Sequence, residues 1–321
     1  MSGGLRPRGE VVLLLAVLLV LAWGDFGGAT AQTLPLNLPD GQWHPLARCW
    51  DKHLQIGLDR LVRSREEWHS LIYQKKMAVG LVDLGNPAQP RFGQVNGDTM
   101  MYAASLPKLA VLLAAFQALE GGTLRPTPDL QRDLIEMIRR SDNSAANRVI
   151  NRVGLAAVEA AVRDPRYRFY EPRHGGLWVG SRYGAEPEPN PEPLKNLLHA
   201  ATAAQVCNFY YLLACGRLIN PERSRQILKI LAFPDLHDKF VAALGQSVPG
   251  HSLYRKSGHW KIWFSDSVLV WAGPKRRYIL VALVEDPQGE KILGDLLPAV
   301  EALLQRLPPP RSGPGRTPAP G

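Results

Sequence analysis

The chain has 321 residues, of which 45% are hydrophobic and 21% charged, and its formal net charge is +9. This length and apolar fraction fit a packed globular domain. The basic charge favours contact with anionic surfaces such as the cell wall or lipid headgroups, although it serves solubility equally well. A nucleic-acid partner is excluded, because no basic stripe with interleaved aromatic residues is present.

The N-terminus has the pattern of a signal peptide. Arginines precede an apolar run over residues 11–23, which is too short to span a bilayer comfortably. Ala29 and Ala31 then fit the small-x-small pattern of signal peptidase, so residues 1–31 are predicted to be cleaved off before Gln32. An uncleaved membrane anchor is the alternative. We expect the mature protein to be periplasmic or secreted.

Polar, proline-rich sequence borders the predicted domain, residues 47–307, on both sides. Residues 32–46 are predicted to be a linker and residues 308–321 a disordered tail. Periodicity and turn residues predict helices at 47–63, 105–119, 128–140, 144–152, 155–162, 202–216, 221–231, 236–244 and 290–306. Strands are expected at 77–84, 91–95, 100–103, 252–257, 260–272 and 277–284. The stretch 164–200 shows little periodicity, and a segment of this kind is usually functional or mobile.

This order of elements predicts an α+β fold. A chain that begins and ends in one sheet, with helices inserted between, forms an antiparallel sheet flanked by helices and a separate all-α lobe. We expect the α/β lobe to comprise residues 47–104 and 251–307, and the helical lobe residues 105–250. Motifs at the junctions between the lobes would line the crevice between them.

The cysteines indicate neither a metal site nor a clear disulfide. Cys207 and Cys215 lie eight residues apart in one predicted helix, about 12 Å along its axis, which exceeds the reach of a disulfide. Only Cys49 could pair with one of them, and burial of all three as small apolar side chains is the preferred interpretation. No spacing of His and Cys predicts a metal ligand set, and no cofactor is expected.

Ser105 and Lys108 form the first candidate catalytic pair. Residues three apart on a helix share a face, so the lysine amine can reach the serine hydroxyl. A serine becomes a strong nucleophile only when a base removes its proton. Burial and the positive end of the helix both favour the neutral, basic form of lysine. Surface Ser/Lys pairs are common, but this helix is apolar over most of its length.

Two later triplets accompany this pair. Ser141 begins a Ser-Asp-Asn triplet between two predicted helices, where an ordinary helix cap is the simpler interpretation. Lys256 begins a Lys-Ser-Gly triplet on a predicted strand, where Gly258 lets a ligand approach the backbone, or marks a β-bulge. Chance explains each triplet alone more easily than it explains their order on helix, turn and strand.

These motifs resemble those of the class A β-lactamase superfamily of serine hydrolases, which includes penicillin-binding D,D-peptidases. The similarity extends over about residues 47–306. It also includes the approach from Met101 to Ser105, and the segment from Ala201 into the following helix. The resemblance implies the family's fold, with an antiparallel sheet and an inserted helical lobe.

The resemblance also implies a role for each motif residue. Ser105 would be acylated, and Lys108 would act as base or proton relay. Ser141 would pass a proton to the leaving nitrogen, assisted by Lys256. Asn143 would bind the amide side chain of the substrate. Lys256 and Ser257 would bind the carboxylate of the substrate, and Gly258 and His259 would contact the substrate along the strand. The backbone N–H groups of Ser105 and His259 would form the oxyanion hole.

Two features depart from the family pattern. The spacing from Ser105 to Ser141 is short, which predicts a trimmed helical lobe. Class A enzymes activate the deacylating water with a Glu on the omega loop, and the region offers Glu171, Glu186, Glu188 and Glu192. Glu192 is the candidate, because Glu192 and Asn196 keep a Glu-Pro-x-x-Asn spacing. A solvated loop carboxylate is the alternative.

Three functions remain open. The first is a hydrolase that opens β-lactams with turnover and supports antibiotic resistance. The second is a D,D-peptidase-like or other amide or ester hydrolase with little β-lactam turnover. The third is a non-catalytic binding domain on the same scaffold. The expected partner is a β-lactam or a small peptidoglycan-like substrate, with a possible anionic cell-wall surface, and the protein is expected to be a monomer.

Overall fold

A computed structural model describes residues 34–35, 38–184 and 190–308. The predicted signal peptide, residues 309–321 of the predicted tail, and Glu186 and Glu188 lie outside the described residues. The described residues form one compact unit. Within the described ranges, no helix has both the length and the apolar character needed to cross a membrane.

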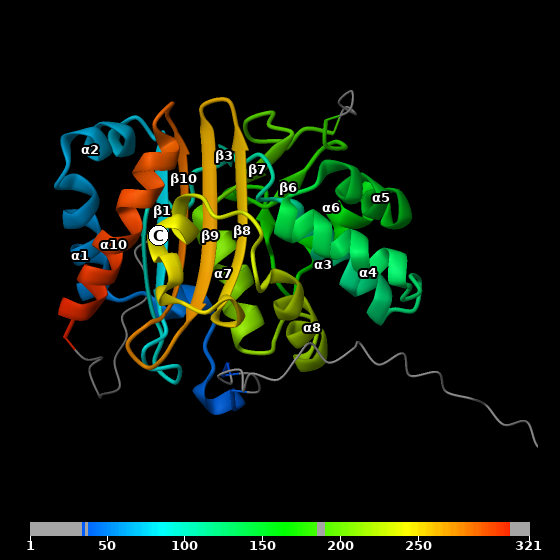
Figure 1. The fold of residues 1–321 in the computed structure, drawn as a ribbon, viewed down its shortest axis with the longest axis horizontal. Coiled ribbons are helices and arrows are strands. Elements are labelled where there is room, and N and C mark those ends of the chain that lie inside the picture. The colour runs from blue at the N-terminus through cyan, green and yellow to red at the C-terminus, as the bar shows by residue number, and fades with distance from the viewer. Residues whose placement is uncertain (1–33, 36–37, 185–189, 309–321) are drawn as a thin grey trace, which may run out of the picture. The chain divides into compact units, whose positions relative to one another are not determined.

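A five-stranded antiparallel sheet in the order β2-β1-β10-β9-β8 forms the centre of the fold (Figure 1). Its strands are β1 (Met77–Asp83), β2 (Arg91–Val95), β8 (Leu253–Trp260), β9 (Trp263–Trp271) and β10 (Arg277–Glu285). β1 pairs with β10 from Met77 opposite Val284 to Asp83 opposite Tyr278. The two ends of the domain therefore meet in one sheet, as the order of the predicted elements requires.

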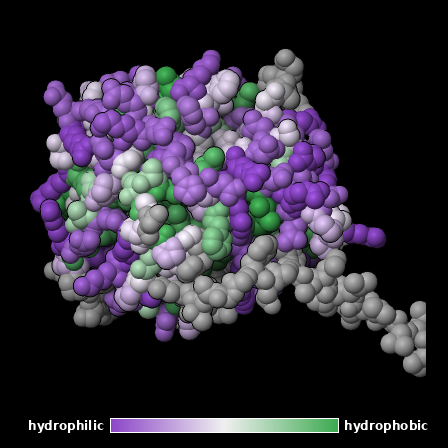
Figure 2. All heavy atoms as spheres, in the orientation of Figure 1, coloured by the Kyte–Doolittle hydropathy of each residue, from purple (hydrophilic) through white to green (hydrophobic). Residues whose placement is uncertain are grey.

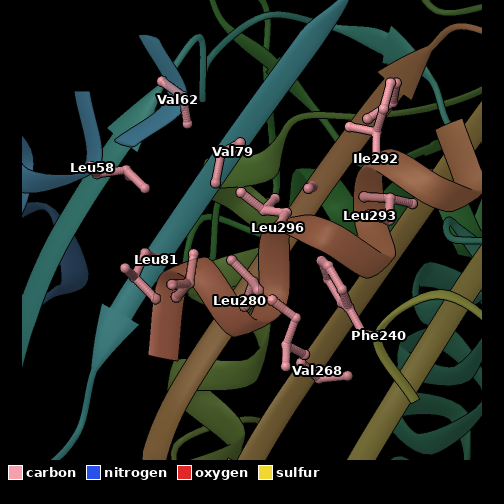
Figure 3. Packing of buried hydrophobic residues seen from close by; sticks show 14 of the residues in the cluster. Leu58, Val62, Val79, Leu81, Phe240, Val268, Leu280, Ile292, Leu293 and Leu296 are labelled. Atoms are coloured by element: carbon pink, nitrogen blue, oxygen red, sulfur yellow. The ribbon is translucent and has the colours of Figure 1, made fainter. Parts of the chain in front are cut away.

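Helices from both ends of the chain cover one face of this sheet. They are α1 (Lys52–Arg63), α2 (Glu66–Tyr73), α9 (Lys239–Leu244) and α10 (Gly289–Arg306). Figure 3 shows Leu293 and Leu296 of α10 packed over the strands, between Leu58 of α1 and Phe240 of α9. Burial of these side chains removes a large apolar area from water and stabilises the layer.

The inserted helices lie on the other side of the sheet from α1, α2 and α10 (Figure 1). They are α3 (Lys108–Glu120), α4 (Pro128–Ile135), α5 (Asn143–Val153), α6 (Leu155–Arg163), α7 (Ala203–Ala214) and α8 (Pro221–Leu231). α7 packs against β1 and β10, while α3 is surrounded by α5, α6 and α8. Apolar residues on all faces of α3 are buried, because this helix is the centre of the helical region. The predicted α+β fold class is therefore confirmed.

The structure differs from the predicted elements in three places. The helix α2 was not predicted, because its apolar residues Trp68, Leu71 and Ile72 stand among charged neighbours. A π-helical turn, Glu136–Arg140, follows α4. Residues 164–200 contain paired short strands: β4 (Tyr170–Glu171) with β5 (Gly175–Gly176), and β6 (Trp178–Val179) with β7 (His199–Ala201), to which β3 (Met101–Tyr102) is also paired.

Residues 38–46 of the predicted linker lie against the domain, and the cysteines lie within it. Within 38–46, the His44 carbonyl accepts a 2.9 Å hydrogen bond from the Tyr211 hydroxyl. Turns of 3₁₀ helix occur at Asp40–Gln42 and Leu46–Cys49, with others at Gly245–Ser247 and Gly250–Ser252. All three cysteines are buried, as expected, and Cys49 lies beside the Tyr211 hydroxyl.

The face shown in Figure 2 carries mostly hydrophilic residues, with apolar residues in smaller areas between them. The apolar side chains that stabilise the fold are instead in the interior, at the α10–sheet contact.

Replacement of a buried leucine in α10 tests this packing. Leu296 is fully buried, so Leu296→Ala is expected to lower the free energy of unfolding by about 2–5 kcal/mol in urea titration. The matched control is Ile56→Ala in α1, where the side chain is 37% exposed and the expected change is within about 0.5 kcal/mol. Equal losses in the two variants would contradict the described core.

Candidate active site

Ser105 lies in a tight turn between β3 and α3, not on the helix itself as predicted. The preceding Ala104 is left-handed, with φ 50°, and the Lys108 N–H donates to the Ser105 carbonyl at 3.2 Å. α3 begins at Lys108, after Pro107 as its cap. A non-glycine residue with positive φ costs free energy and is found preferentially at functional sites. The turn holds Ser105 half-buried at the start of α3.

Lys108 is fully buried and makes specific polar contacts. Its Nζ donates to the Ser141 carbonyl at 2.6 Å and to Asn143 Oδ1 at 2.8 Å. Burial lowers the pKa of Lys108 to about 7, against the opposing effect of the Asp142 charge. Among the described residues, no hydrogen bond joins this amine to the Ser105 hydroxyl. Catalytic contacts are often long in free enzymes and tighten with substrate, so this geometry alone does not exclude the pair as nucleophile and base.

The first triplet follows the π-helical turn and leads into α5. Ser141 is left-handed, with φ 58°, and its hydroxyl accepts a 2.9 Å hydrogen bond from Lys256 Nζ. Asp142 is the N-cap of α5 and accepts from the Ala145 N–H. The helix-cap interpretation is therefore right for Asp142, while Ser141 and Asn143 face the lysines. Turns of π-helix occur frequently at functional sites.

The second triplet brings β8 against the Ser105 turn. Lys256 is 1% exposed, and its Nζ also donates to the Ser257 carbonyl at 2.5 Å. Burial, followed by the charges of Lys108 and Arg255, lowers the pKa of Lys256 well below the ordinary lysine value. A Cβ on Gly258 would lie 2.3 Å from the Ala103 carbonyl oxygen and 2.8 Å from the Ser105 nitrogen. Only glycine permits this approach between the two backbones.

The other two residues expected on this strand differ in their burial. Ser257 is buried. The His259 ring is exposed and stacks on Phe264 with ring centroids 4.2 Å apart. The predicted role of this residue concerns only its backbone N–H, so the outward position of the ring is compatible with it.

A buried ion-pair network that the sequence analysis missed supports this strand. Arg255 Nε donates to Asp266 Oδ1 at 2.8 Å, and Arg255 Nη2 to Asp266 Oδ2 at 2.7 Å. Asp238 also pairs with the guanidinium. Bidentate arginine–carboxylate pairs have a defined geometry, so this network positions β8 immediately before Lys256. Its signal in the sequence is weak: charged residues inside two otherwise apolar strands.

The structure does not bring Glu192 into hydrogen bonding with Ser105 or Lys108. Its carboxylate is buried and accepts from the N–H groups of Leu194 at 2.8 Å and Lys195 at 2.6 Å. The Tyr170 hydroxyl lies 3.4 Å from Oε2. These bonds stabilise the loop. The Glu192 carboxylate is therefore not the solvated charge of the alternative interpretation, and it is not hydrogen-bonded to Ser105 or Lys108.

Three further residues that were not predicted form a chain of contacts that begins at Lys108. The Tyr183 ring centroid lies 4.5 Å from Lys108 Nζ, and His199 stacks on this ring with centroids 4.2 Å apart. Ser181 contacts the His199 ring. All three come from the stretch 164–200, where the lack of periodicity gave no signal for individual side chains. The described part of the chain contains no cluster of three or more His, Cys, Asp or Glu residues that could hold a metal ion.

The arrangement as a whole places a serine hydroxyl, two buried lysines and a second serine hydroxyl at the contact of β8 with the helical region. Nucleophilic attack by the serine on a carbonyl group is the chemistry that such a set supports.

Comparisons with known proteins were made for sequence and for fold. The family model described as the beta-lactamase enzyme family matches residues 127–305. This match includes both triplets and begins after Ser105 and Lys108. The comparison with curated protein sequences found no match.

Solved structures share the fold at low sequence identity. The beta-lactamase from Sphaerobacter thermophilus DSM 20745 is 19% identical over 79% of this chain and 99% of its own, with a TM-score of 0.59. PBP-A is 19% identical over 80% and 98%, with a TM-score of 0.58. A PBP-A mutant, solved as an acyl-enzyme complex with penicillin G, is 20% identical over 80% and 98%, with a TM-score of 0.57.

The close approach at Gly258 predicts the effect of adding a single methyl group. Gly258→Ala is expected to lower the free energy of unfolding by about 1–3 kcal/mol, because the new Cβ overlaps backbone atoms. The control is Gly294→Ala in α10, where no atom lies within 4 Å and a gain of up to about 1 kcal/mol is expected. Urea titration measures both, and an unchanged stability of Gly258→Ala contradicts the described packing.

Proposed function

The chain belongs to the beta-lactamase enzyme family, and we propose that it is an exported serine hydrolase that forms an acyl-enzyme on Ser105. The substrate is a β-lactam or a related amide. One observation carries the proposal: Lys108 and Lys256 are both buried, and their amines donate to Ser141 and, from Lys108, to Asn143. A lysine of this kind is a base, because burial favours its neutral form.

Each residue then has one task in acylation. Lys108 takes the proton of the Ser105 hydroxyl as its oxygen attacks the carbonyl carbon of the substrate. The N–H groups of Ser105 and His259 stabilise the oxyanion. Ser141 gives its proton to the leaving nitrogen and receives in return the proton that Lys108 took from Ser105, so that both Lys108 and Ser141 regain their starting forms. Lys256, which donates to the Ser141 hydroxyl, supports this transfer.

Substrate binding uses the neighbouring polar groups. Since Asn143 Oδ1 accepts from Lys108, the amide Nδ2 is left to donate to the amide carbonyl of the substrate. Lys256 and Ser257 bind its carboxylate, and Gly258 leaves room along the strand. A basic protein outside the cytoplasm also meets anionic cell-wall polymers. Export rests on residues 1–31, with the mature chain beginning at Gln32 in the periplasm or medium.

A second candidate is a D,D-peptidase-like or other amide hydrolase that turns β-lactams over slowly. The observation in its favour is the Glu192 carboxylate, which is engaged by its own loop. Intact mass with excess penicillin separates the candidates: a transient adduct with consumed drug supports turnover, and a persistent adduct supports the second candidate. A non-catalytic domain gives no adduct.

Removal of the nucleophile is the direct test. The wild-type protein is expected to gain the mass of one penicillin G molecule, and Ser105→Ala to gain none, because the ester cannot form without the hydroxyl. Ser64→Ala, at an exposed position after α1, is the matched control and should be labelled like the wild type. Labelling of Ser105→Ala would show that another residue is the nucleophile.

The pH dependence of acylation tests the base. Because burial lowers the pKa of Lys108 to about 7, the acylation rate should rise with pH as the amine loses its proton and level off above pH 8. At pH 6 about a tenth of the maximal rate is expected. Lys108→Arg, which stays charged, should acylate about 10²–10⁴-fold more slowly. A wild-type rate independent of pH between 5 and 8 would exclude Lys108 as the base.

A further inference from the structure

The Tyr183–His199 stack beside Lys108 has no task in acylation. Tyr183 contacts both the lysine amine and the imidazole, with its ring centroid 4.5 Å from Lys108 Nζ and 4.2 Å from the His199 centroid. The two stacked rings are nearly parallel, at 9°. Tyr102 flanks the same imidazole from β3, with centroids 6.4 Å apart.

Two polar atoms in this stack are buried and have no hydrogen-bond partner among the described residues: the Tyr183 hydroxyl and His199 Nδ1. The side chains that carry them are 6% and 7% exposed. An unpaired buried polar group costs about 1–3 kcal/mol, so such groups usually mark a bound water or a functional role.

The neighbours of His199 determine which nitrogen is free to accept a proton. The Ser181 hydroxyl donates to the Arg182 carbonyl at 3.2 Å and lies 3.3 Å from His199 Nε2. A hydroxyl has one hydrogen, and with it on the Arg182 carbonyl we assign the ring proton to Nε2, which then donates to Ser181. Nδ1 is then an unprotonated acceptor. Burial, followed by the charge of Lys108, lowers the pKa of His199 to about 4, so the ring is neutral at physiological pH.

The imidazole is also held in place relative to the nucleophile. The His199 carbonyl accepts a 2.8 Å hydrogen bond from the N–H of Ala103, two residues before Ser105. β7, which begins at His199, is paired with β3 in antiparallel orientation. The backbone of His199 is therefore fixed relative to the Ser105 turn by strand pairing, and the stack on Tyr183 orients the ring.

We propose that His199, at Nδ1, accepts the proton of the water that hydrolyses the Ser105 acyl-enzyme, with the Tyr183 hydroxyl holding that water. This assignment rests on the proposed function. It gives the deacylation step to a pair that the family motifs do not contain, since the Glu192 carboxylate is engaged within its own loop.

The step balances as follows. The water oxygen bonds to the acyl carbonyl carbon while one water proton moves to His199 Nδ1, which makes an imidazolium ion. The tetrahedral intermediate then collapses with cleavage of the bond to Ser105 Oγ. The serine oxygen leaves and takes up the proton that His199 received from the water. The product acid and the free hydroxyl are formed, and the imidazole is neutral again.

The test separates deacylation from acylation. Each protein is labelled with penicillin G, freed of excess drug, and followed by intact mass as the adduct decays. Adduct formation is timed separately. For His199→Asn the decay rate is expected to fall about 10²–10⁴-fold, while the rate of adduct formation stays within about threefold of the wild type. For Tyr183→Phe, which keeps the ring, the decay is expected to slow about tenfold.

Controls make the outcome specific. His174→Asn removes an exposed histidine from the same stretch of chain and should leave both rates unchanged. Normal adduct formation by His199→Asn shows that the variant is folded. The assignment is overturned if the His199→Asn adduct decays at the wild-type rate, if Glu192→Gln alone slows decay, or if the wild-type adduct persists. These results leave acylation of Ser105 standing, whereas absence of any wild-type adduct refutes the proposed function itself.

Discussion

Two lysine amines, those of Lys108 and Lys256, are buried where the described structure gives neither of them a salt bridge, and the site depends on how this burial is accommodated. A buried ammonium group without a paired charge costs several kcal/mol. Both amines are instead satisfied by carbonyl, amide and hydroxyl oxygens. Burial lowers the pKa of both lysines, and the charge of Lys108 acts in the same direction on Lys256. A shift of this direction favours the basic amine that takes the proton of a serine nucleophile.

This constraint accounts for the surrounding backbone. The acceptors for the lysines come from Ser141 and Asn143, so the π-helical turn and the left-handed Ser141 bring those oxygens into the interior. The turn at Ala104 and the missing side chain at Gly258 let the Ser105 turn and β8 approach each other. Strain at two positions is offset by the packed α3 and by the Arg255–Asp266 pair beneath the strand.

Much of the fold and the motif set could be predicted from the sequence. β2 and α8 have the expected bounds, and most other elements agree within a few residues. The start of α3 was expected at Ser105, because sequence does not reveal a left-handed residue such as Ala104. The stretch 164–200 was expected to have little regular structure, and its short strands depend on pairing partners far along the chain, which periodicity cannot detect.

The sequence by itself determined the residue types of Ser105, Lys108, Ser141 and Lys256, their order, and the apolar patterns that build the sheet and α3. Only the tertiary structure decided how the polar groups are used. It directed the Glu192 carboxylate to the N–H groups of its own loop, and it placed Tyr183 and His199 beside Lys108. The physical reason is that burial and hydrogen-bond partners, which set the pKa and the accessibility of a side chain, arise from segments that meet only after folding.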